Sequence, residues 1–422
     1  MSDLVFDGPP GAALLEGWSD EQPWRILLPW PEETRTLPWD RACDWKSFLD
    51  ELTASPLSPL RGERVGVRGE SGVTGAPHPG PLPGGERGLG AHAAPFVSGW
   101  VGFISYEAMA CEEAVLPRAH PPPEPAAFFA LHRRAVYLDD GLDRAASPGP
   151  RGTLRDSFGK GEYGRAVERI REAIRDGDVY QVNLTRSFTV PGRRDPAELY
   201  RALTAPHPPR SSAFIRGDGW SIASASPEVL LRFDRNSGIA ESRPIKGTVR
   251  RGDASAVDAL LGSEKDASEH LMIVDVVRND FGKIAPPGAV SVPAFRTVQT
   301  LEHVHHLEST VRATGLRDRS LTEVLAALSP AASITGAPKR AAVQMIREAE
   351  PVPRGVYCGA IGYIDFRGHA ELSVAIRTAV ATEDEVRYHA GGGIVWDSDA
   401  AAEDDETRAK SLAFLKFAGV ET

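Results

Sequence analysis

Apolar residues recur at helical spacing in several segments of the chain. In the most regular one, Tyr163, Val167, Ile170 and Ile174 are three or four positions apart, and an Asp-Gly pair at 176–177 follows them. This spacing puts the four side chains on one face of a helix, and the glycine favours its end. Similar patterns predict helices at 44–52, 254–261, 265–277, 321–328, 339–348 and 402–417.

Short apolar runs between these helices predict β-strands. They occupy 96–109, 179–188, 212–217, 220–226, 229–234, 238–245, 358–366, 370–382 and 385–395. Most of these runs meet another strand at a short turn, and only some meet a helix. That order favours large antiparallel or mixed sheets with helices outside them, rather than a doubly wound βαβ repeat.

Two stretches interrupt the regular pattern. Residues 55–90 contain ten Gly and six Pro but no Phe, Trp or Tyr. A segment without bulky apolar side chains cannot offset the entropy lost on ordering, so we expect a solvated, disordered insertion there. A polar stretch at 142–157 separates a looser N-terminal subregion, 1–150, from the more regular core, 151–422.

The composition excludes several classes of protein. The chain has 422 residues, with 48 Lys and Arg against 58 Asp and Glu, so it lacks the basic balance of nucleic-acid binders. No apolar run approaches the ~18 residues of a membrane span. The cysteines Cys43, Cys111 and Cys358 show no CxxC spacing, and the N-terminus has no signal-peptide pattern. We therefore expect a cytoplasmic enzyme with reduced thiols and with no nucleic-acid or membrane partner.

Two pairs of carboxylates have the spacing of a metal site. Asp266 and Glu269 are three positions apart on one predicted helix, and Glu403 and Glu406 are three apart on another. Residues at this spacing project from the same helix face. Four such carboxylates would repel one another unless a cation lay between them, and oxygen ligands suit Mg²⁺. The alternative is a pair of solvated acidic faces.

A lysine and a glutamate form a second candidate pair. Lys246 lies at the end of a predicted strand, in the motif RPIKGT, and Glu228 opens an earlier strand after Ser-Pro. If the two strands are neighbours, the residues supply a nucleophile and a proton donor. The alternative for Lys246 is an ordinary solvated charge.

Several residues near the C-terminus have the chemistry to bind anions. Arginine grips a carboxylate with two donors, lysine supplies a point charge, and the amides of a glycine turn can donate to an anion. The candidates are Tyr357, Arg377, Lys410 and the GGG turn of Gly391, Gly392 and Gly393. The alternative for the glycines is a plain strand-to-helix connection.

The histidine-rich segment LEHVHHLEST does not predict a transition-metal site. Strand alternation puts His303 and His305 on one face and His306 on the other, and no cysteine or further histidine joins them at ligand spacing. His306 alone remains a candidate acid, base or hydrogen-bond donor. In SITGAPKRAAVQMI, Thr335 is the expected helix cap and Pro338 lies in the first turn.

These motifs occur together in one order. The order is YQVNLT, SPE, RPIKGT, KDASEHLMIVDVVRND, VHHLEST, SITGAPK, RGVYCGAIGYI, ELSVAIRT, GGGIVWDSD and EDDETRAK. It resembles the chorismate-utilising enzymes, and within them the aminodeoxychorismate synthase component I family, densely over 163–418. The resemblance implies one α/β (α+β) domain over 1–422, with two stacked, mainly antiparallel β-sheets flanked by helices and the active site between the sheets.

The resemblance also implies roles for the candidate residues. Glu269 and Glu406 would ligate Mg²⁺, with Asp266 and Glu403 holding its waters. Tyr357, Arg377, Lys410 and the amides of Gly391, Gly392 and Gly393 would bind the carboxylates of chorismate, while Thr248 and His306 would position groups around its ring. Glu228 would be the general acid that protonates the C4 hydroxyl, and Lys246 the nucleophile that adds at C2.

Two positions separate the family members. Anthranilate synthases typically have PIAGT where this chain has PIKGT, so Lys246 favours amination at C4. Isochorismate and salicylate synthases have a lysine in place of Gln181, which activates water; a glutamine cannot act as that base, so ammonia is the expected nucleophile. The alternatives are an anthranilate synthase component I and a catalytically silent chorismate-binding regulatory protein.

The source of ammonia is expected to be another chain. None of the three cysteines lies in a glycine-rich nucleophile elbow, so a separate glutaminase subunit is the implied partner. No lyase segment follows the last predicted helix. The expected product is therefore 4-amino-4-deoxychorismate, a precursor of 4-aminobenzoate and folate.

Overall fold

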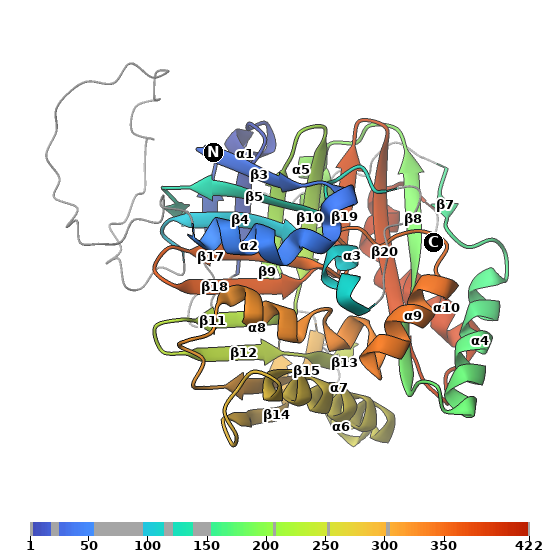
Figure 1. Cartoon of the computed structure of the whole chain (residues 1–422). Helices are drawn as coiled ribbons and strands as arrows, with labels where there is room; N and C mark the ends of the chain where they lie inside the picture. The colour runs from blue at the N-terminus through green and yellow to red at the C-terminus, as the bar shows by residue number, and fades with distance from the viewer. Residues whose placement is uncertain are drawn as a thin grey trace, which may run out of the picture.

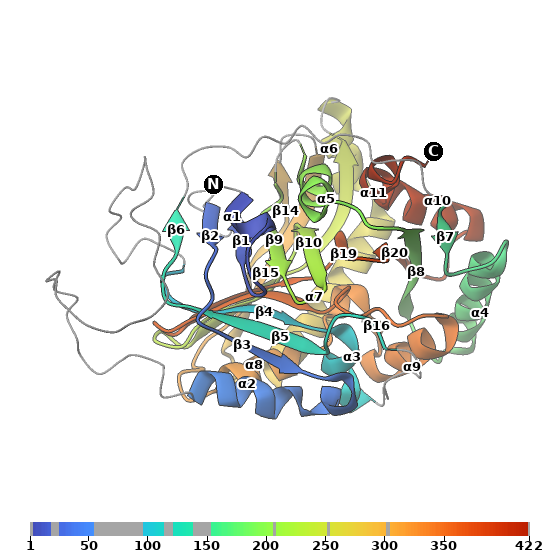
Figure 2. The ribbon, with the colours of Figure 1, turned by 90° about the horizontal axis from the view of Figure 1, so that it is seen from above.

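A computed structural model describes residues 3–17, 25–54, 96–113, 121–137, 153–205, 208–250, 254–300 and 304–420. Two ten-stranded sheets lie one above the other, and every pairing within them is antiparallel (Figures 1 and 2). The predicted fold class, two stacked antiparallel sheets with helices outside, is confirmed. The insertion predicted at 55–90 lies outside the described residues.

The first sheet contains the strands that carry the glutamine and glycine motifs. Its order is β16 (Gly336–Ala337), β8 (Gln181–Pro191), β20 (Glu385–Ile394), β19 (Thr378–Thr382), β10 (Trp220–Ser226), β9 (Ser211–Arg216), β1 (Ala13–Glu16), β2 (Arg25–Leu28) and β6 (Val136–Tyr137), with β7 (Arg155–Asp156) beside β8.

The second sheet contains the strands that carry the lysine and histidine motifs. Its order is β13 (Ile245–Arg250), β15 (Val304–Ala313), β12 (Ile239–Arg243), β11 (Val229–Asp234), β18 (His369–Val374), β17 (Ala360–Asp365), β4 (Gly99–Ile104), β5 (Ala127–His132) and β3 (Glu33–Leu37), with β14 (Val290–Thr300) beside β15.

An apolar core joins the two sheets at one end of the stack. In β1, Ala13 and Leu15 belong to this core, whereas Leu14 belongs to a separate cluster on the other face of the sheet. The alternation follows from the pleat of the strand, and both faces are apolar because both are covered. Phe103 and Phe128 of the second sheet meet Trp220 of the first edge-on, with ring centroids 5.6 and 5.1 Å away.

Helices cover the outer faces of the stack. The cluster that contains Leu14 also contains side chains of α5 (Pro196–Thr204) and α11 (Leu412–Phe417). On the other side, one apolar cluster includes residues of α2 (Trp45–Ala54), α4 (Glu162–Asp176), α7 (Glu264–Gly282), α8 (Leu321–Leu328) and α9 (Lys339–Ala349). The remaining helices are α1 (Asp3–Phe6), α3 (Tyr106–Met109), α6 (Ala254–Gly262) and α10 (Ala400–Lys410), with short 3-10 turns η1 (Trp39–Asp44), η2 (Cys111–Glu113) and η3 (Ala332–Ile334).

Several predicted elements have different boundaries in the structure. The single strand predicted at 370–382 is two strands, β18 and β19, which lie in different sheets. Between them Arg377 has a φ of 51°, a left-handed conformation that lets the chain turn from one sheet to the other. The helix predicted at 402–417 is broken at Ser411 into α10 and α11, and the segment predicted at 96–109 ends in α3.

Two local predictions are wrong. Gly391, Gly392 and Gly393 do not form a turn; they lie inside β20, paired with Thr185, Leu184 and Asn183 of β8. Thr335 does not cap α9, because the cap is Pro338 and the Thr335 hydroxyl donates instead to the Ala331 carbonyl. The short strand β16, which pairs with β8, lies between Thr335 and the start of α9.

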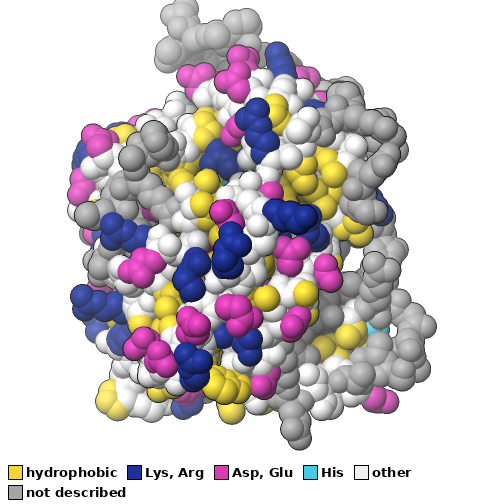
Figure 3. Space-filling model, turned by 90° about the vertical axis from the view of Figure 1, so that its right-hand side faces the viewer, with side chains coloured by type: hydrophobic (Ala, Val, Ile, Leu, Met, Phe, Trp, Pro, Cys, Tyr) yellow, Lys and Arg dark blue, Asp and Glu magenta, His cyan; other side chains and the backbone are white. Residues whose placement is uncertain are grey.

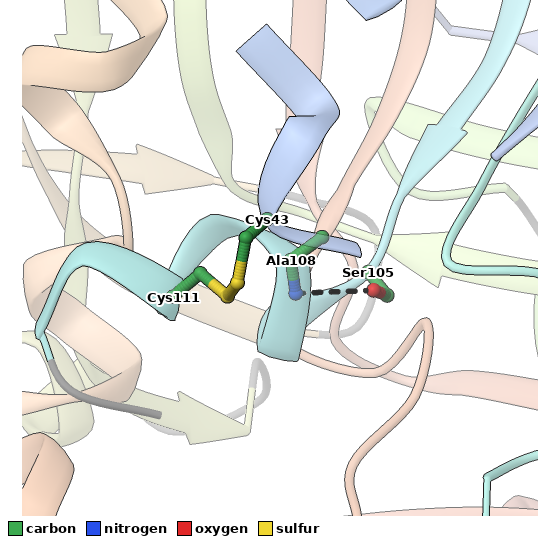
Figure 4. The surroundings of a disulfide bond; sticks show 4 residues. All are labelled: Cys43, Ser105, Ala108 and Cys111. Carbon is green, nitrogen blue, oxygen red and sulfur yellow. Dashed lines mark hydrogen bonds between the residues drawn. A yellow bond between two sulfur atoms is a disulfide. The ribbon is translucent and has the colours of Figure 1, made fainter. Parts of the chain in front are cut away.

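A disulfide joins Cys43 of η1 to Cys111 of η2 (Figure 4). The expectation that these two thiols are reduced is therefore wrong. Their 68-residue separation gave no local signal, because the pairing depends on η1 and η2 packing together. Beside them the Ser105 hydroxyl accepts a hydrogen bond from the Ala108 amide, which caps α3. Cys358 is buried and unpaired.

Within the part of the chain that the structure describes, no helix has the length and apolar character to cross a bilayer.

Candidate functional site

The two sheets bring Gln181, Lys246 and Gly393 together from three strands. A Cβ atom added at Gly393 would lie 2.5 Å from Gln181 Nε2 and 3.5 Å from Lys246 Nζ. The missing side chain at position 393 thus leaves room for two polar groups that come from opposite sheets. Gln181 is fully buried, and neither its amide nitrogen nor its oxygen has a hydrogen-bond partner among the described residues. Such a buried, unsatisfied amide points to a ligand or water at this position.

Glu228 precedes β11 and lies on the same side of the site as Lys246. Burial raises the pKa of its carboxyl to about 7, while the nearby Ser333 side chain and Lys246 oppose the rise and Glu308 adds to it. Near neutral pH this carboxyl is divided between its two protonation states, which suits a general acid. Glu228 also lines a small cavity with Ser242, Ser333 and other residues of β11, α7 and α8. The strands that follow Glu228 and carry Lys246 are not neighbours as expected, because β12 and β15 lie between β11 and β13. The charge of Lys246 nevertheless acts on the Glu228 carboxyl.

His306 and Arg377 also lie near each other. The pKa of His306 is lowered to about 4 by burial, and further by the charges of Arg377 and Arg210. The imidazole is consequently neutral at neutral pH and serves as a hydrogen-bonding group rather than a cation. In the register of β13 and β15, His306 is opposite Thr248, whose side chain lies outside the described part of the structure. His303 also lies outside the described residues.

The carboxylates of α10 converge on β20. A Cβ atom at Gly392 would lie 3.0 Å from Glu403 Oε2 and 3.7 Å from Glu406 Oε1. Glu403 is buried and accepts a hydrogen bond from Ser398 Oγ at 2.7 Å. Glu406 is half-exposed, and Lys410 Nζ lies 2.6 Å from its carboxylate. This helix belongs to a face with interspersed acidic and basic side chains (Figure 3).

The carboxylates of α7 do not complete a metal site in the described residues. Glu269 is half-buried on α7, and the side chain of Asp266 lies outside the described part of the structure. Among the described residues no three His, Cys, Asp or Glu side chains converge as ligands of one ion. The oxygen donors of Glu403 and Glu406, gathered where Gly392 has no side chain, match the preference of Mg²⁺ for oxygen ligands.

Lys410 and Tyr357 lie along the strand that carries the glycines. Besides its ion pair with Glu406, Lys410 Nζ donates to the Gly391 carbonyl at 2.8 Å. Tyr357 is buried and stacks on His389 of β20 with ring centroids 5.3 Å apart, and burial raises the pKa of its hydroxyl. The site residues predicted from the sequence thus come from both sheets and from α10.

The structure adds residues that the sequence analysis did not identify. Ser333 of η3 lies beside Glu228. The positive charge of Arg210 helps to lower the pKa of His306, and Arg210 Nη1 forms an ion pair with Glu308 Oε2 at 3.1 Å. Ser333 opens the SITGAPK motif, of which only Thr335 and Pro338 were considered from the sequence, and Arg210 lies in none of the quoted motifs. Cys358 does not serve as a nucleophile, because burial raises the pKa of its thiol to about 12 and keeps it protonated at neutral pH.

The chain is similar to several known proteins. Residues 142–416 match the model of the chorismate binding enzymes. The aminodeoxychorismate synthase of Streptomyces pristinaespiralis is 46% identical over 251 residues, which are 58% of this chain and 34% of that protein, so this chain spans about a third of that relative. The anthranilate synthase component 1 of Saccharolobus solfataricus is 35% identical over 345 residues, 77% of this chain and 82% of that protein. The crystal structure of anthranilate synthase component I from Streptococcus pneumoniae has a TM-score of 0.73 and 26% identity, covering 94% of this chain and 93% of that one.

Proposed function

Because this chain belongs to the chorismate binding enzymes, we propose that it is the subunit of an aminodeoxychorismate synthase that aminates chorismate. The observation that carries the proposal is the position of Lys246, whose amine lies beside Gly393 and Gln181 and close to Glu228. A primary amine next to a carboxylic acid is the pair that a covalent substitution on chorismate needs.

The proposed reaction has two balanced steps. In the first, Lys246 Nζ forms a bond to C2 of the ring, the double bond shifts towards C4, and the C4 hydroxyl leaves as water with a proton from Glu228. In the second, ammonia forms a bond to C4, the double bond shifts back, and the Lys246 amine leaves C2. The product, 4-amino-4-deoxychorismate, is a precursor of 4-aminobenzoate and folate.

The other residues hold the substrate in place for these steps. Arg377 and Lys410 bear the cationic charges proposed for the carboxylates of chorismate, and Tyr357 lies along the same strand of the site. Neutral His306 would donate or accept one hydrogen bond at the ring, together with Thr248. Gln181 has no basic nitrogen, which favours ammonia over an activated water as the second nucleophile.

We propose Mg²⁺ as the cofactor. Glu269 and Glu406 would be its ligands, and Glu403 and Asp266 would hold its waters. When bound, the ion would draw electron density from the ring carboxylate as a Lewis acid. Replacing Glu269 with Gln should therefore weaken the Mg²⁺ dependence of the rate, and an unchanged dependence would remove Glu269 from the ligand set.

The ammonia is proposed to come from a separate glutaminase subunit. The buried thiol of Cys358 and the disulfide of Cys43 and Cys111 leave no cysteine of this chain as a glutaminase nucleophile. We expect free ammonium to support the reaction with this chain alone. Glutamine should replace ammonium only after the partner subunit is added.

A product assay tests the proposal. Purified protein is incubated with chorismate, Mg²⁺ and ammonium, and the products are separated. We expect 4-amino-4-deoxychorismate. Formation of 2-aminobenzoate and pyruvate without any added lyase would show anthranilate synthase activity instead, an alternative supported by the long match to the anthranilate synthase of Saccharolobus solfataricus. No turnover, with chorismate still raising the melting temperature, would indicate a chorismate-binding protein without catalysis.

A further inference from the structure

A buried arginine links several segments that surround the proposed site. The side chain of Arg354 is 1% exposed. Its Nη1 donates to the Ile334 carbonyl at 2.8 Å, and its Nη2 donates to the Asn183 carbonyl at 2.8 Å. Its Nε and Nη2 also donate to both oxygens of Glu350, at 2.9 and 2.6 Å. The planar guanidinium thus holds two backbone carbonyls and one carboxylate at once.

Two buried glutamates complete the cluster around Arg354. Glu350 Oε1 also accepts a hydrogen bond from the Thr185 amide of β8 at 2.8 Å. Glu107 of α3 accepts hydrogen bonds from the backbone amides of Arg354 and Gly355, at 2.7 and 3.0 Å. These contacts fix the cation on both its side-chain and its backbone atoms.

The two carbonyls held by Arg354 belong to two walls of the site. Ile334 follows Ser333, which lies beside Glu228. Asn183 lies two residues after Gln181 and is opposite Gly393 in the strand register. The guanidinium therefore links η3, which lies beside the proposed acid Glu228, to β8, which lies beside the proposed nucleophile Lys246. A displacement of either wall changes the distance between those groups.

Stability alone does not explain a charged group in this position. A buried ion pair gains little over a well-packed apolar pair, because both charges lose their hydration. An apolar pair would fill the volume but could not hold the carbonyls of Ile334 and Asn183 at a fixed separation. The arrangement is therefore better suited to fixing geometry than to adding stability.

We propose that Arg354 is a positioning residue whose guanidinium fixes η3 and strand β8 relative to each other, and so sets the place of Glu228 against Lys246 and Gln181. The proposal rests on the proposed function only in naming Glu228 as the acid. Lysine cannot replace the planar guanidinium of Arg354, because a single ammonium group cannot direct donors to both backbone carbonyls and to both carboxylate oxygens of Glu350.

The test compares Arg354→Lys and the double variant Arg354→Met/Glu350→Leu with the wild type. Chorismate consumption with ammonium is measured as kcat and KM across pH, and each rate is normalised to the folded fraction. Arg354→Lys retains the charge and should fold, yet kcat should fall by about 10²-fold with a smaller change in KM, because small misplacements of reacting groups have effects of this size. The pH midpoint of kcat should also shift in both variants.

The groups that determine this pH midpoint can be named. Glu228 is faced by Lys246 of β13, Glu308 of β15 and Ser333 of η3, and Asp280 of α7 lines the same cavity. Of these, the Ser333 segment is the one that Arg354 holds directly through Ile334. Because the buried carboxyls of Glu228 and Glu107 also make stability depend on pH, the folded fraction is measured at each pH and the rate is divided by it. A midpoint that remains shifted after this correction separates positioning from a purely structural role.

A matched control comes from the far end of the first sheet. Arg25 pairs with buried Glu16, with Nε and Oε1 2.6 Å apart, and four strands separate β1 from β8. Arg25→Gln should lower the melting temperature and leave kcat, KM and the pH midpoint unchanged. A wild-type kcat, or an unshifted midpoint, in folded Arg354→Lys overturns the proposal. The identity of the wild-type product tests the proposed function separately, because the kinetic comparison uses chorismate consumption whichever aminated product forms.

Discussion

The two ends of the sheet stack differ in what they bury. Where β1, β9 and β10 face β4 and β5, the interior is apolar, with Phe103, Phe128 and Trp220 at its centre. Where β8 and β20 approach β13 and β15, the interior holds Gln181, Glu228, His306 and other polar side chains. The same architecture thus combines an apolar core at one end with the candidate site at the other. Burying polar groups without full hydrogen bonding costs folding free energy, so such groups indicate which end of the stack contains a binding or catalytic site.

The largest expected effect is a loss of activity from a substitution at the polar end of the stack. Lys246→Ala should reduce chorismate amination by about 10⁴-fold, equivalent to ~5 kcal/mol of transition-state stabilisation, because the variant lacks the attacking amine. Lys246 is only partly buried, so the melting temperature should stay near that of the wild type. Steady-state assays at low ammonium measure the loss. A variant with wild-type rates would remove Lys246 from the mechanism.

The next effect concerns stability at the apolar end. Phe103→Ala should lower the free energy of unfolding by about 4 kcal/mol, because it leaves a cavity between the sheets. Urea denaturation measures the change. The activity of the folded fraction should remain within about twofold of the wild type, since additive behaviour is expected for distant sites. A change in KM for chorismate would show that the two ends are coupled.

Glu228→Gln should change both stability and rate. The raised pKa means that native Glu228 binds its proton more tightly than unfolded Glu228, so the wild type loses stability as pH rises from about 4.5 to about 7. Above this window the glutamine variant should be more stable than the wild type by about 1–3 kcal/mol, and below it the difference should vanish. The rate should fall by about 10²-fold for lack of a proton donor.

Unfolding curves on both sides of that pH window test the stability effect. Glu107 also has a pKa raised to about 7 by burial, so part of the pH dependence should persist in the Glu228 variant. Only the difference between the two proteins reports on Glu228. Equal stability of the wild type and the variant at every pH would contradict the assigned protonation behaviour.

The smallest effect concerns the proposed Mg²⁺ site. Gly392→Ala would place a methyl group 3.0 Å from Glu403 Oε2 and 3.7 Å from Glu406 Oε1. We expect the Mg²⁺ concentration for half-maximal rate to rise several-fold, equivalent to ~1 kcal/mol. Gly164→Ala of α4 is the control, since its methyl group makes an ordinary 3.7 Å contact with Ala400 of α10, the helix that carries Glu403 and Glu406. If both variants need more Mg²⁺, the effect arises from α10 packing and not from the carboxylates.

Many helices and strands could be predicted from the local pattern of apolar and polar residues. Helical periodicity from Tyr163 to Ile174 predicted α4, and strand-like runs predicted β9, β10 and β11. The candidate residues Glu228, Lys246, Gln181 and His306 were identified from short sequence motifs and their order along the chain.

Other features depended on contacts between distant segments. The strand position of Gly391, Gly392 and Gly393 arises from pairing with β8, and the disulfide of Cys43 and Cys111 joins turns 68 residues apart. The apolar pattern predicts a strand over 385–395, but neither the pairing of its glycines with β8 nor the partner of each cysteine is encoded locally, because the partners are far away along the chain.

The sequence by itself determined many of the helices and strands of the core, the family resemblance and the identity of most candidate groups. Only the tertiary structure decided which of these groups meet, that His306 is neutral, and that Arg354 ties the walls of the site together. The physical reason is range. Helix and strand patterns reflect interactions within a few residues, whereas burial, pKa shifts and buried ion pairs exist only once two sheets have packed together.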